Sequence, residues 1–127
     1  MSQTASGQTL PILTRLTRRP QFLFVREGAR AARGCLVVEA RKRPVGGGAI
    51  GVGFTASRKV GNAILRNRAK RRLRALADRV MVEAGNPALD YVLVARPETV
   101  VRDFALMERE LRHALQKIGE GKSGAKP

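Results

Sequence analysis

The chain has 127 residues, and its 25 Lys and Arg against 10 Asp and Glu give a formal net charge of +15. This length allows one compact domain with a modest core, and a hydrophobic fraction of 43% excludes a disordered polyelectrolyte. The excess of cations favours a polyanionic partner, nucleic acid above all.

Two absences in the sequence favour the cytoplasm. No apolar run is long enough to span a membrane or to form the core of a signal peptide. The single cysteine, Cys35, has no partner for an internal disulfide, and its apolar neighbours favour a small buried hydrophobe over a reactive thiol. We therefore expect a cytoplasmic protein with no membrane partner.

The N-terminal part predicts a flexible arm followed by a short helix. Residues 1–12 are mostly small, uncharged and without periodicity, which is typical of a mobile arm. Beyond them, Phe22, Val25 and Ala29 recur at helical spacing, with a proline before them and a glycine near the end. A helix is therefore predicted over residues 20–28.

Two strands are predicted next. Residues 35–40 are dense in β-branched side chains, and a second strand is predicted over residues 49–56. The basic and glycine-rich connection 41–48 joins them, so we expect the two strands to pair as a hairpin. A G-x-G-x-x-G pattern at residues 46–51 leads into a strand and not into a helix, which excludes a dinucleotide-binding loop.

The longest helical pattern covers residues 60–84. Its apolar residues step by three or four positions and form one narrow stripe, which we expect to face the core. Gly85 and Pro87 end the helix. The stripe consists of Leu65, Ala69, Leu73, Leu76, Val80 and Ala84.

The C-terminal part predicts a buried strand over residues 91–95 and an amphipathic helix capped by Asp103 or Thr99. The order of helix, strands, helix, strand and helix favours the α+β class, a small single-domain sandwich with helices packed on a sheet. We assign this domain to residues 13–118 and a flexible tail to residues 119–127. The apolar stripe of the last helix consists of Phe104, Met107, Leu111, Leu115 and Ile118.

The segment 57–74 contains eight basic residues and no acidic residue. A solvated face is the ordinary explanation of charge on a helix, but such faces usually mix both signs. Arginine meets phosphate oxygens in a bidentate fork, and a helical row spaces these forks along an RNA backbone. The candidate RNA-binding residues are Arg58, Lys59, Asn62, Arg66, Asn67, Arg68, Lys70, Arg71 and Arg74.

Helical geometry orders these side chains around the apolar stripe. With the stripe facing inward, Asn67, Arg71 and Arg74 are predicted to project to the opposite face. Arg68 and Lys70 flank this row. The amide of Asn67 both donates and accepts, so it suits a base edge, a 2′-hydroxyl or a neighbouring arginine.

Two further groups of residues have two open interpretations each. Phe22 and Phe24 could stack on unpaired bases, but Phe22, like Phe54, could instead pack in the core, because the chain has only five aromatic side chains. Arg41, Lys42 and Arg43 either contact an RNA backbone or remain solvated.

The sequence offers no convincing acid–base pair or carboxylate cluster with which the polypeptide itself would cleave RNA. His113 is the only histidine, and its place in an amphipathic helix favours a surface or half-buried side chain. Glu108 and Glu110 point to different sides of that helix. We assign no catalytic and no metal-binding residue, and we infer a binding protein whose RNA partner performs the chemistry.

The block VGFTASRKVGNA at residues 52–63, followed by RNRAKR at residues 66–71, resembles the signature of the protein component of bacterial ribonuclease P. Weaker similarity extends over residues 14–118. The resemblance implies an α-β-β-β-α-β-α fold with an unusual left-handed crossover. It also implies a catalytic RNA as partner, in an endoribonuclease that removes the 5′ leader of precursor tRNA with Mg²⁺ held mainly by the RNA.

In that family the basic helix and the turn before it meet the catalytic RNA, and a cleft between the sheet and the first helix takes the single-stranded leader. Phe22 matches an aromatic position of this cleft, and Phe54 is assigned to it as well. The family often has further aromatic residues where Arg26 and either Glu39 or Val38 stand here. We therefore expect leader contacts that are more electrostatic than usual.

Arg72 falls at the border of the apolar stripe, and we expect its stem to lie over the core while its guanidinium reaches outward. In the resembling family this position is commonly apolar, so we assign Arg72 no RNA contact. Two other functions stay open beside the ribonuclease P subunit. One is a ribosomal-type or other structural RNA-binding protein, and the other is a nuclease that acts without RNA.

Overall fold

The structure is a computed structural model that describes residues 12–45 and 48–121. The expected N-terminal arm lies outside these ranges except for Ile12, which begins a strand. Of the expected C-terminal tail only residues 119–121 are described, and Gly119 ends the last helix. No helix within these ranges is long and apolar enough to cross a membrane.

Five strands of the described residues form one mixed sheet in the order β2-β5-β6-β4-β3. The pairs β2–β5 and β5–β6 are parallel, and the pairs β6–β4 and β4–β3 are antiparallel. β6 is the central strand of this order, and six of its seven residues, LDYVLVA, are apolar. The strands are β2 (Ile12–Arg15), β3 (Ala29–Arg33), β4 (Leu36–Lys42), β5 (Ala49–Thr55) and β6 (Leu89–Ala95).

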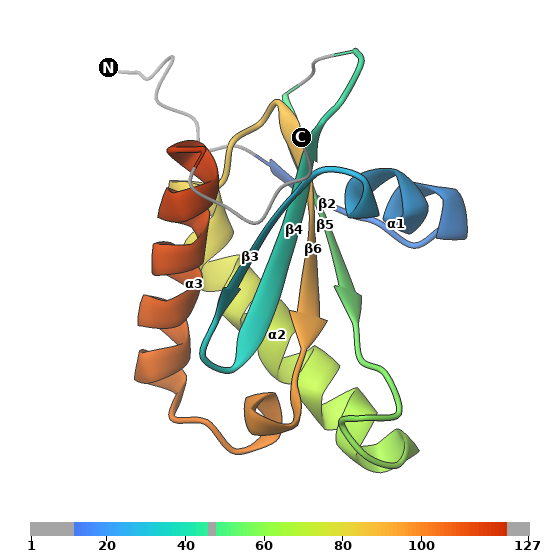
Figure 1. Cartoon of the computed structure of the whole chain (residues 1–127), viewed down its shortest axis with the longest axis vertical. Coiled ribbons are helices and arrows are strands. Elements are labelled where there is room, and N and C mark those ends of the chain that lie inside the picture. The colour runs from blue at the N-terminus through green and yellow to red at the C-terminus, as the bar shows by residue number, and fades with distance from the viewer. Residues whose placement is uncertain (1–11, 46–47, 122–127) are drawn as a thin grey trace.

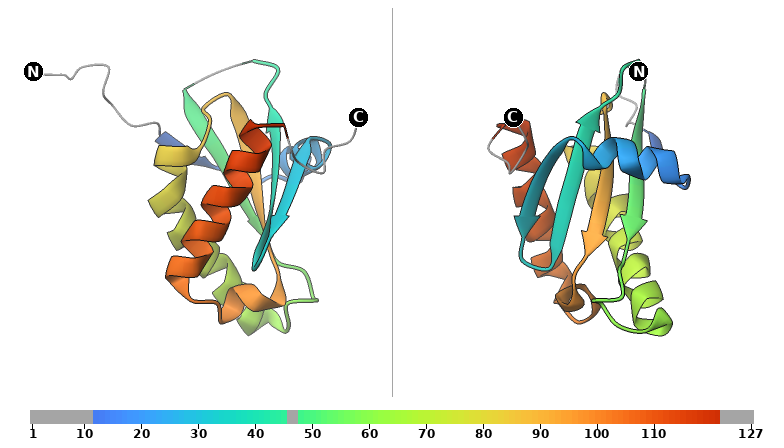
Figure 2. Two further views of the ribbon diagram at one scale, coloured as in Figure 1. Left: turned by 60° about the vertical axis from the view of Figure 1, so that its left-hand side comes forward. Right: turned by 45° about the vertical axis from the view of Figure 1, so that its right-hand side comes forward.

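The sheet lies between two layers of helix (Figure 1). One face carries α1 (Arg19–Arg26), and the other is covered by α2 (Ala63–Ala84) and α3 (Phe104–Gly119). The right panel of Figure 2 shows α1 in front of the strands and the two longer helices behind them. A 3-10 turn, η1 (Pro97–Val100), connects β6 to α3. The predicted α+β class and the order α-β-β-β-α-β-α are confirmed, with β2 added in front.

The connection from β5 through α2 to β6 has the left-handed sense that the resemblance implies. In Figure 1 both strands run downward, β6 lies to the left of β5, and α2 passes behind the sheet. A right-handed crossover with this strand order would place α2 in front. The left-handed sense puts α2 on the same face as α3.

The predicted hairpin between β4 and β5 is wrong, because β6 lies between these two strands. β4 instead forms a hairpin with β3, a short strand that its own residues did not indicate. Ala29, whose spacing from Phe22 and Val25 suggested a helix, begins β3 and pairs with Ala40. The reason lies in β6, where Tyr91, Val92 and Leu93 are all buried. Such a strand requires neighbours on both edges and a helical layer on both faces.

β5 alternates between the two faces of the sheet. Gly51 and Gly53 point toward α1, and their missing Cβ atoms let Leu16 and Phe22 pack directly against the strand. The residues that alternate with these glycines point toward α2 and belong to the main core. These residues are Ile50, Val52 and Phe54.

The main core lies between the sheet and the helices α2 and α3. Most of the apolar stripe predicted for α2 faces this core, as expected. Leu65 is only half-buried, and Ala84 is exposed at the end of the helix, so the stripe is shorter than predicted. The fully buried residues of the predicted stripe are Ala69, Leu73, Leu76 and Val80.

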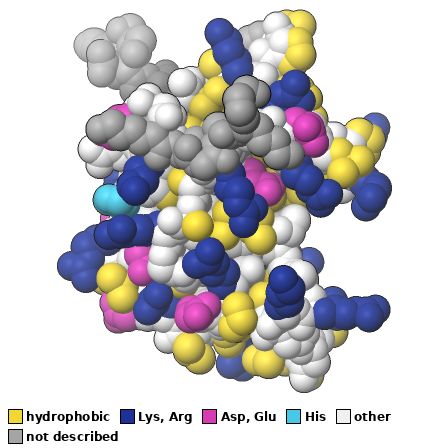
Figure 3. Space-filling model, in the orientation of Figure 1, with side chains coloured by type: hydrophobic (Ala, Val, Ile, Leu, Met, Phe, Trp, Pro, Cys, Tyr) yellow, Lys and Arg dark blue, Asp and Glu magenta, His cyan; other side chains and the backbone are white. Residues whose placement is uncertain are grey.

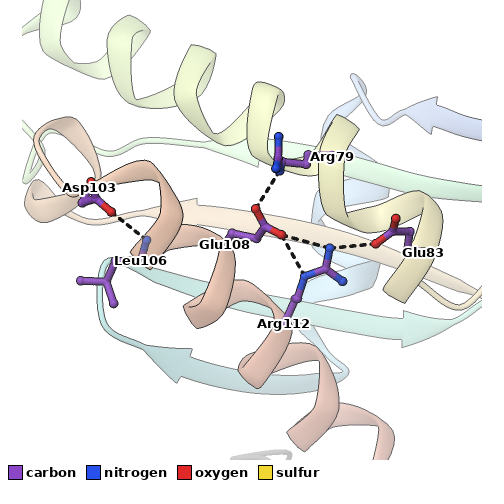
Figure 4. A network of polar contacts seen from close by, with 6 residues as sticks. All are labelled: Arg79, Glu83, Asp103, Leu106, Glu108 and Arg112. Atoms are coloured by element: carbon purple, nitrogen blue, oxygen red, sulfur yellow. Dashed lines mark hydrogen bonds and ion pairs between the residues drawn. The ribbon is translucent and has the colours of Figure 1, made fainter.

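Outside the core, ion pairs join α2 to α3 (Figure 4). The carboxylate of Glu108 accepts from Arg79 at 2.7 Å and from Arg112 in its own helix at 3.2 Å. Arg112 also donates to Glu83 on α2 at 2.8 Å. Hydrogen bonds, first from Arg79 and then from Arg112, hold the pKa of Glu108 below its ordinary value. This network marks the outer side of the α2–α3 contact.

The two predicted cap residues both make hydrogen bonds at the start of an element. Asp103 caps α3, because its carboxylate accepts from the backbone N–H of Leu106 at 3.1 Å. Thr99 lies in η1, where its hydroxyl accepts from the backbone N–H of Arg96 at 2.9 Å and donates to the carbonyl of Cys35 at 2.5 Å. Thr99 thereby fixes η1 against the turn between β3 and β4.

Candidate nucleic-acid interface

The turn between β5 and α2 presents the first basic residues of the candidate interface. The backbone N–H of Val60 donates to the carbonyl of Ser57 at 3.0 Å, and the side chain of Val60 is buried. Gly61 has a φ of +144°, a conformation that favours glycine. Arg58 and Lys59 lie exposed within this turn. The turn therefore holds two cations on a well-defined backbone.

Asn62 is the N-cap of α2. Its side-chain oxygen accepts from the backbone N–H of Leu65 at 3.0 Å, and its own backbone is extended, as is usual for this position. The cap determines the residue at which the helix begins. It therefore also determines the direction in which the following basic side chains point.

The central basic residues of α2 face solvent. Asn67, Arg68 and Arg71 are exposed, and Arg66 and Lys70 are half-buried. Among the ion pairs of the described residues, none involves the segment 57–74. In Figure 3, Lys and Arg side chains surround the start of α2 at the lower right, away from the acidic side chains of that view. We call this set the α2 basic surface: Arg58, Lys59, Asn62, Arg66, Asn67, Arg68, Lys70 and Arg71.

Arg74 was predicted to project to the face opposite the apolar stripe, but it does not. It is half-buried and lines a depression of about 140 Å³ together with Arg15, Phe54 and Asp78. The strand β2, which was not expected from the sequence, covers this flank of α2. Arg74 thus lies at the margin of the α2 basic surface, and an RNA contact by this residue stays a prediction.

Arg72 lies over the border of the core, as predicted, but its guanidinium turns toward α3 and does not reach outward as was expected. Its guanidinium donates to the backbone carbonyl of Arg102 and lies 3.2 Å from the sulfur of Met107. Arg72 therefore ties α2 to the segment that leads into α3. This contact supports the placement of α2 and leaves the exposed arginines to face a partner.

A cleft of about 330 Å³ lies between α1 and the sheet, and we call it the α1 cleft. Phe22 lines it, on the side of the helix that the resemblance implied. Arg26 and Glu39 line it as well, at the places where the resembling family often has aromatic residues. The carboxylate of Glu39 lies 3.5 Å from the guanidinium of Arg30, which partly offsets its charge. The other lining residues are Thr55, Ala56, Ser57, Val92 and Val94.

Phe54 does not line the α1 cleft, so its assignment beside Phe22 is corrected. Its ring packs against the main core on the opposite face of the sheet, 5.5 Å from the guanidinium carbon of Arg15. Adjacent residues of a strand face opposite sides, and Gly53 already faces Phe22. Phe54 must therefore point toward α2.

The α1 cleft and the α2 basic surface adjoin each other. Thr55, Ala56 and Ser57 line the cleft, and the next two residues are the exposed Arg58 and Lys59. Thr55 and Ala56 were not predicted from the sequence to belong to any site. Their position between the end of a strand and a basic turn was the available signal, but only the packing of α1 shows that a cleft opens there.

The two glutamates considered for catalysis, Glu108 and Glu110, lie on different sides of α3. Within residues 12–45 and 48–121, no three His, Cys, Asp or Glu side chains converge to hold a metal ion. Burial, followed by a hydrogen bond to Glu110, raises the pKa of the Cys35 thiol to about 12. Glu108 and Glu110 serve different sides of α3, as predicted, because Glu108 binds arginines while Glu110 accepts from the backbone N–H of Cys35 at 3.1 Å.

Comparison with known proteins gives a consistent family. A family model described as Ribonuclease P matches residues 10–119. The ribonuclease P protein component of Ruegeria pomeroyi is 48% identical over 105 residues, which cover 81% of this chain and 84% of that protein. The ribonuclease P protein component of Caulobacter vibrioides is 40% identical over 101 residues, which cover 80% of this chain and 68% of that protein.

Solved structures share the fold. The RNase P protein from Thermotoga maritima matches with a TM-score of 0.65 at 28% identity, covering 82% of this chain and 96% of that chain. The RNase P protein of Staphylococcus aureus also matches with a TM-score of 0.65, covering 82% of this chain and 94% of that chain. The latter is 24% identical, so its likeness concerns the fold alone.

Proposed function

Because the chain belongs to the ribonuclease P protein family, we propose that its α2 basic surface binds the catalytic RNA and its α1 cleft holds the 5′ leader of precursor tRNA. Proteins of this family are subunits of a ribonucleoprotein endoribonuclease. The observation that carries the proposal is the adjacency of the two surfaces, which meet at Ser57 and Arg58. A strand held in the cleft would pass directly to the place where the RNA is bound.

The α2 basic surface supplies attraction for a folded RNA. Arg68 and Arg71 are exposed three positions apart, so their guanidinium groups lie on one side of the helix. Each can meet phosphate oxygens in a bidentate fork. Asn67 lies next to Arg68 in the chain and one turn before Arg71, and its amide suits a base edge or a 2′-hydroxyl, which marks RNA. The absence of acidic neighbours in the segment 57–74 keeps this attraction uncompensated.

The α1 cleft supplies different contacts, which suit a single strand. The ring of Phe22 offers a surface on which an unpaired base stacks. Arg26 places a cation beside it for a leader phosphate. The protein thereby binds and orients the leader, while the chain's own side chains take no part in breaking the phosphodiester.

The proposal assigns bond cleavage to the catalytic RNA. Mg²⁺ held mainly by that RNA would stabilise charge on the scissile phosphate and lower the pKa of an attacking water. The described residues offer no convergent set of three metal-binding side chains, so no step is assigned to a metal on the protein.

A reconstitution assay tests the proposed function. Labelled precursor tRNA is incubated at low Mg²⁺ with the protein, with the catalytic RNA, and with both together. We expect cleavage at the mature 5′ end only when both are present. Cleavage by the protein alone would indicate a protein nuclease, and a protein that leaves the RNA reaction unchanged would indicate a structural RNA-binding protein of the ribosomal type.

A further inference from the structure

A second groove runs along the flank of α1 that faces away from the α1 cleft. It consists of two depressions of about 330 Å³ and about 440 Å³ that share Gln21, Arg43 and Asp90. Phe22 lines the cleft on one flank of α1, whereas Phe24 lines this groove on the other. The helix therefore separates two hollows on the same face of the sheet.

One end of the groove is apolar and open to solvent. Pro20, Phe24, Pro44 and Val45 line it, and Val45 is 81% exposed. Single exposed apolar residues are common, but a contiguous apolar set in a concave surface favours a binding site. We call this part the Phe24 groove.

The ring of Phe24 already carries a planar cation. The guanidinium carbon of Arg41 lies 4.3 Å from the centre of the ring, and Nη1 of Arg41 donates to the backbone carbonyl of Phe24 at 3.2 Å. The hydrogen bond holds the guanidinium in place against the ring. A phenyl ring and an arginine plane are the two protein surfaces on which unpaired RNA bases stack.

The charge around the Phe24 groove suits a polyanion. Asp90 is the acidic residue of its lining, and its carboxylate pairs with Arg43 at 2.6 Å. The residues next to the groove in the chain include the exposed Arg19, Arg41 and Lys42. An apolar stacking surface bordered by cations is the combination that single-stranded nucleic acid requires. An apolar protein partner would gain nothing from these cations.

We propose that the Phe24 groove is a second stacking site for an unpaired base, occupied by a leader nucleotide upstream of those in the α1 cleft. The inference rests on the proposed function, because it requires a leader in the cleft. A leader long enough to pass α1 emerges beside the groove, where its next base stacks against Phe24 and Arg41. Leaders that end within the cleft do not reach it.

This inference is tested by varying the leader length and by comparing two variants, Val45→Asp in the groove and Val101→Asp outside it. Holoenzyme reconstituted from catalytic RNA and full-length protein is titrated with precursor tRNA whose leader has about 5 or about 15 nucleotides, which span the site sizes of single-strand-binding domains. The wild-type holoenzyme is expected to bind the long leader at least about 5-fold more tightly than the short one. Val45→Asp is expected to remove this gain.

Val101→Asp is the control, because Val101 is also 81% exposed but lies after η1 and outside the groove. It receives the same substitution and is expected to retain the gain from leader length. A Val45→Asp holoenzyme that also retains the gain would overturn the inference while leaving the α1 cleft intact. Failure of the wild type to bind even the short leader would overturn the proposed function, and this inference with it.

A fluorescence measurement locates the base directly. 2-Aminopurine is placed at successive leader positions, and stacking quenches its emission. We expect quenching at positions within the α1 cleft and again at one or two positions farther upstream. Phe24→Leu should relieve only the upstream quenching, so the signal from the cleft reports that the variant is folded. Upstream quenching that persists in Phe24→Leu, or self-association of the protein that Val45→Asp abolishes, would contradict a base in the groove.

Discussion

Phe22 lies directly over Gly53: a Cβ atom added to this glycine would come within 2.6 Å of the ring carbon Cε1. The strand beneath the ring therefore presents bare backbone. Val92, which pairs with Gly53 on the neighbouring strand, lines the α1 cleft beside it. The absence of one side chain on β5 thus sets the position of the ring that we expect to meet the leader.

Gly53→Ala should weaken binding of the 5′ leader more than binding of the rest of the precursor tRNA. The added methyl group forces Phe22 outward, which we expect to cost about 1–3 kcal/mol of stability and to weaken the leader contribution to binding about 10-fold. The measurement compares holoenzyme affinity for precursor tRNA with affinity for mature tRNA, which lacks the leader. Gly119→Ala is the control, since an added Cβ there meets no atom within 4 Å. An unchanged affinity ratio in Gly53→Ala would separate Phe22 from leader binding.

Arg68→Ala should reduce the salt dependence of binding to the catalytic RNA. Each phosphate contact contributes about 0.9 to the slope of log affinity against log salt, so losing one contact lowers the slope by about that amount. Arg79→Ala is a matched control on the same helix, because Arg79 is exposed but bound to Glu108. Equal slopes for wild type and Arg68→Ala would exclude a direct phosphate contact by Arg68.

Asn62 allows the capping and RNA-binding roles to be separated. Asn62→Ala removes the hydrogen bond to Leu65 and should lower the free energy of unfolding by about 0.5–2 kcal/mol. Asn62→Asp keeps a capping oxygen and should preserve stability, yet its negative charge should weaken RNA binding. Urea unfolding and RNA titration of both variants check this. An Asp variant that binds RNA as tightly as the wild type would argue against an RNA backbone near Asn62.

Stability should fall as the pH rises above the ordinary range of a thiol. The folded state raises the pKa of Cys35 from 9.0 to about 12, chiefly by burial, and burial raises the pKa of Tyr91 as well. Between these values the folded chain keeps a proton that the unfolded chain loses, so alkali favours unfolding. Cys35→Ala should show a shallower decline in urea unfolding between about pH 8 and pH 11. If the free energy of unfolding fell equally with pH in the wild type and in Cys35→Ala, ionisation of the thiol would not contribute to the loss of stability in alkali.

The sequence by itself determined the elements whose burial follows a regular period. The helices α2 and α3 and the strand β6 are found where they were predicted, and each buries most of its predicted apolar residues, although the stripe of α2 is shorter than expected at both ends. The one-signed charge of residues 57–74 likewise identified the α2 basic surface without any knowledge of the fold. These features depend on neighbours within one or two turns of the chain, so local spacing is sufficient to detect them.

Only the tertiary structure decided how these elements meet. β2 and β3 bury few side chains and show no clear period, so neither strand could be predicted from local spacing. Without β3, the hairpin partner of β4 could not be inferred. Without β2, the strand that covers the flank of α2 at Arg74 could not be inferred either. Alternation along a strand places Gly53 and Phe54 on opposite sides of the sheet, but it does not tell which side carries α1, and for that reason Phe54 was assigned to the wrong side. A period assigns residues to a common face, whereas the segment that covers that face is set by packing between distant parts of the chain. For this reason the basic helix was predictable from local spacing, whereas the α1 cleft was expected only from the family resemblance and the Phe24 groove was not expected at all.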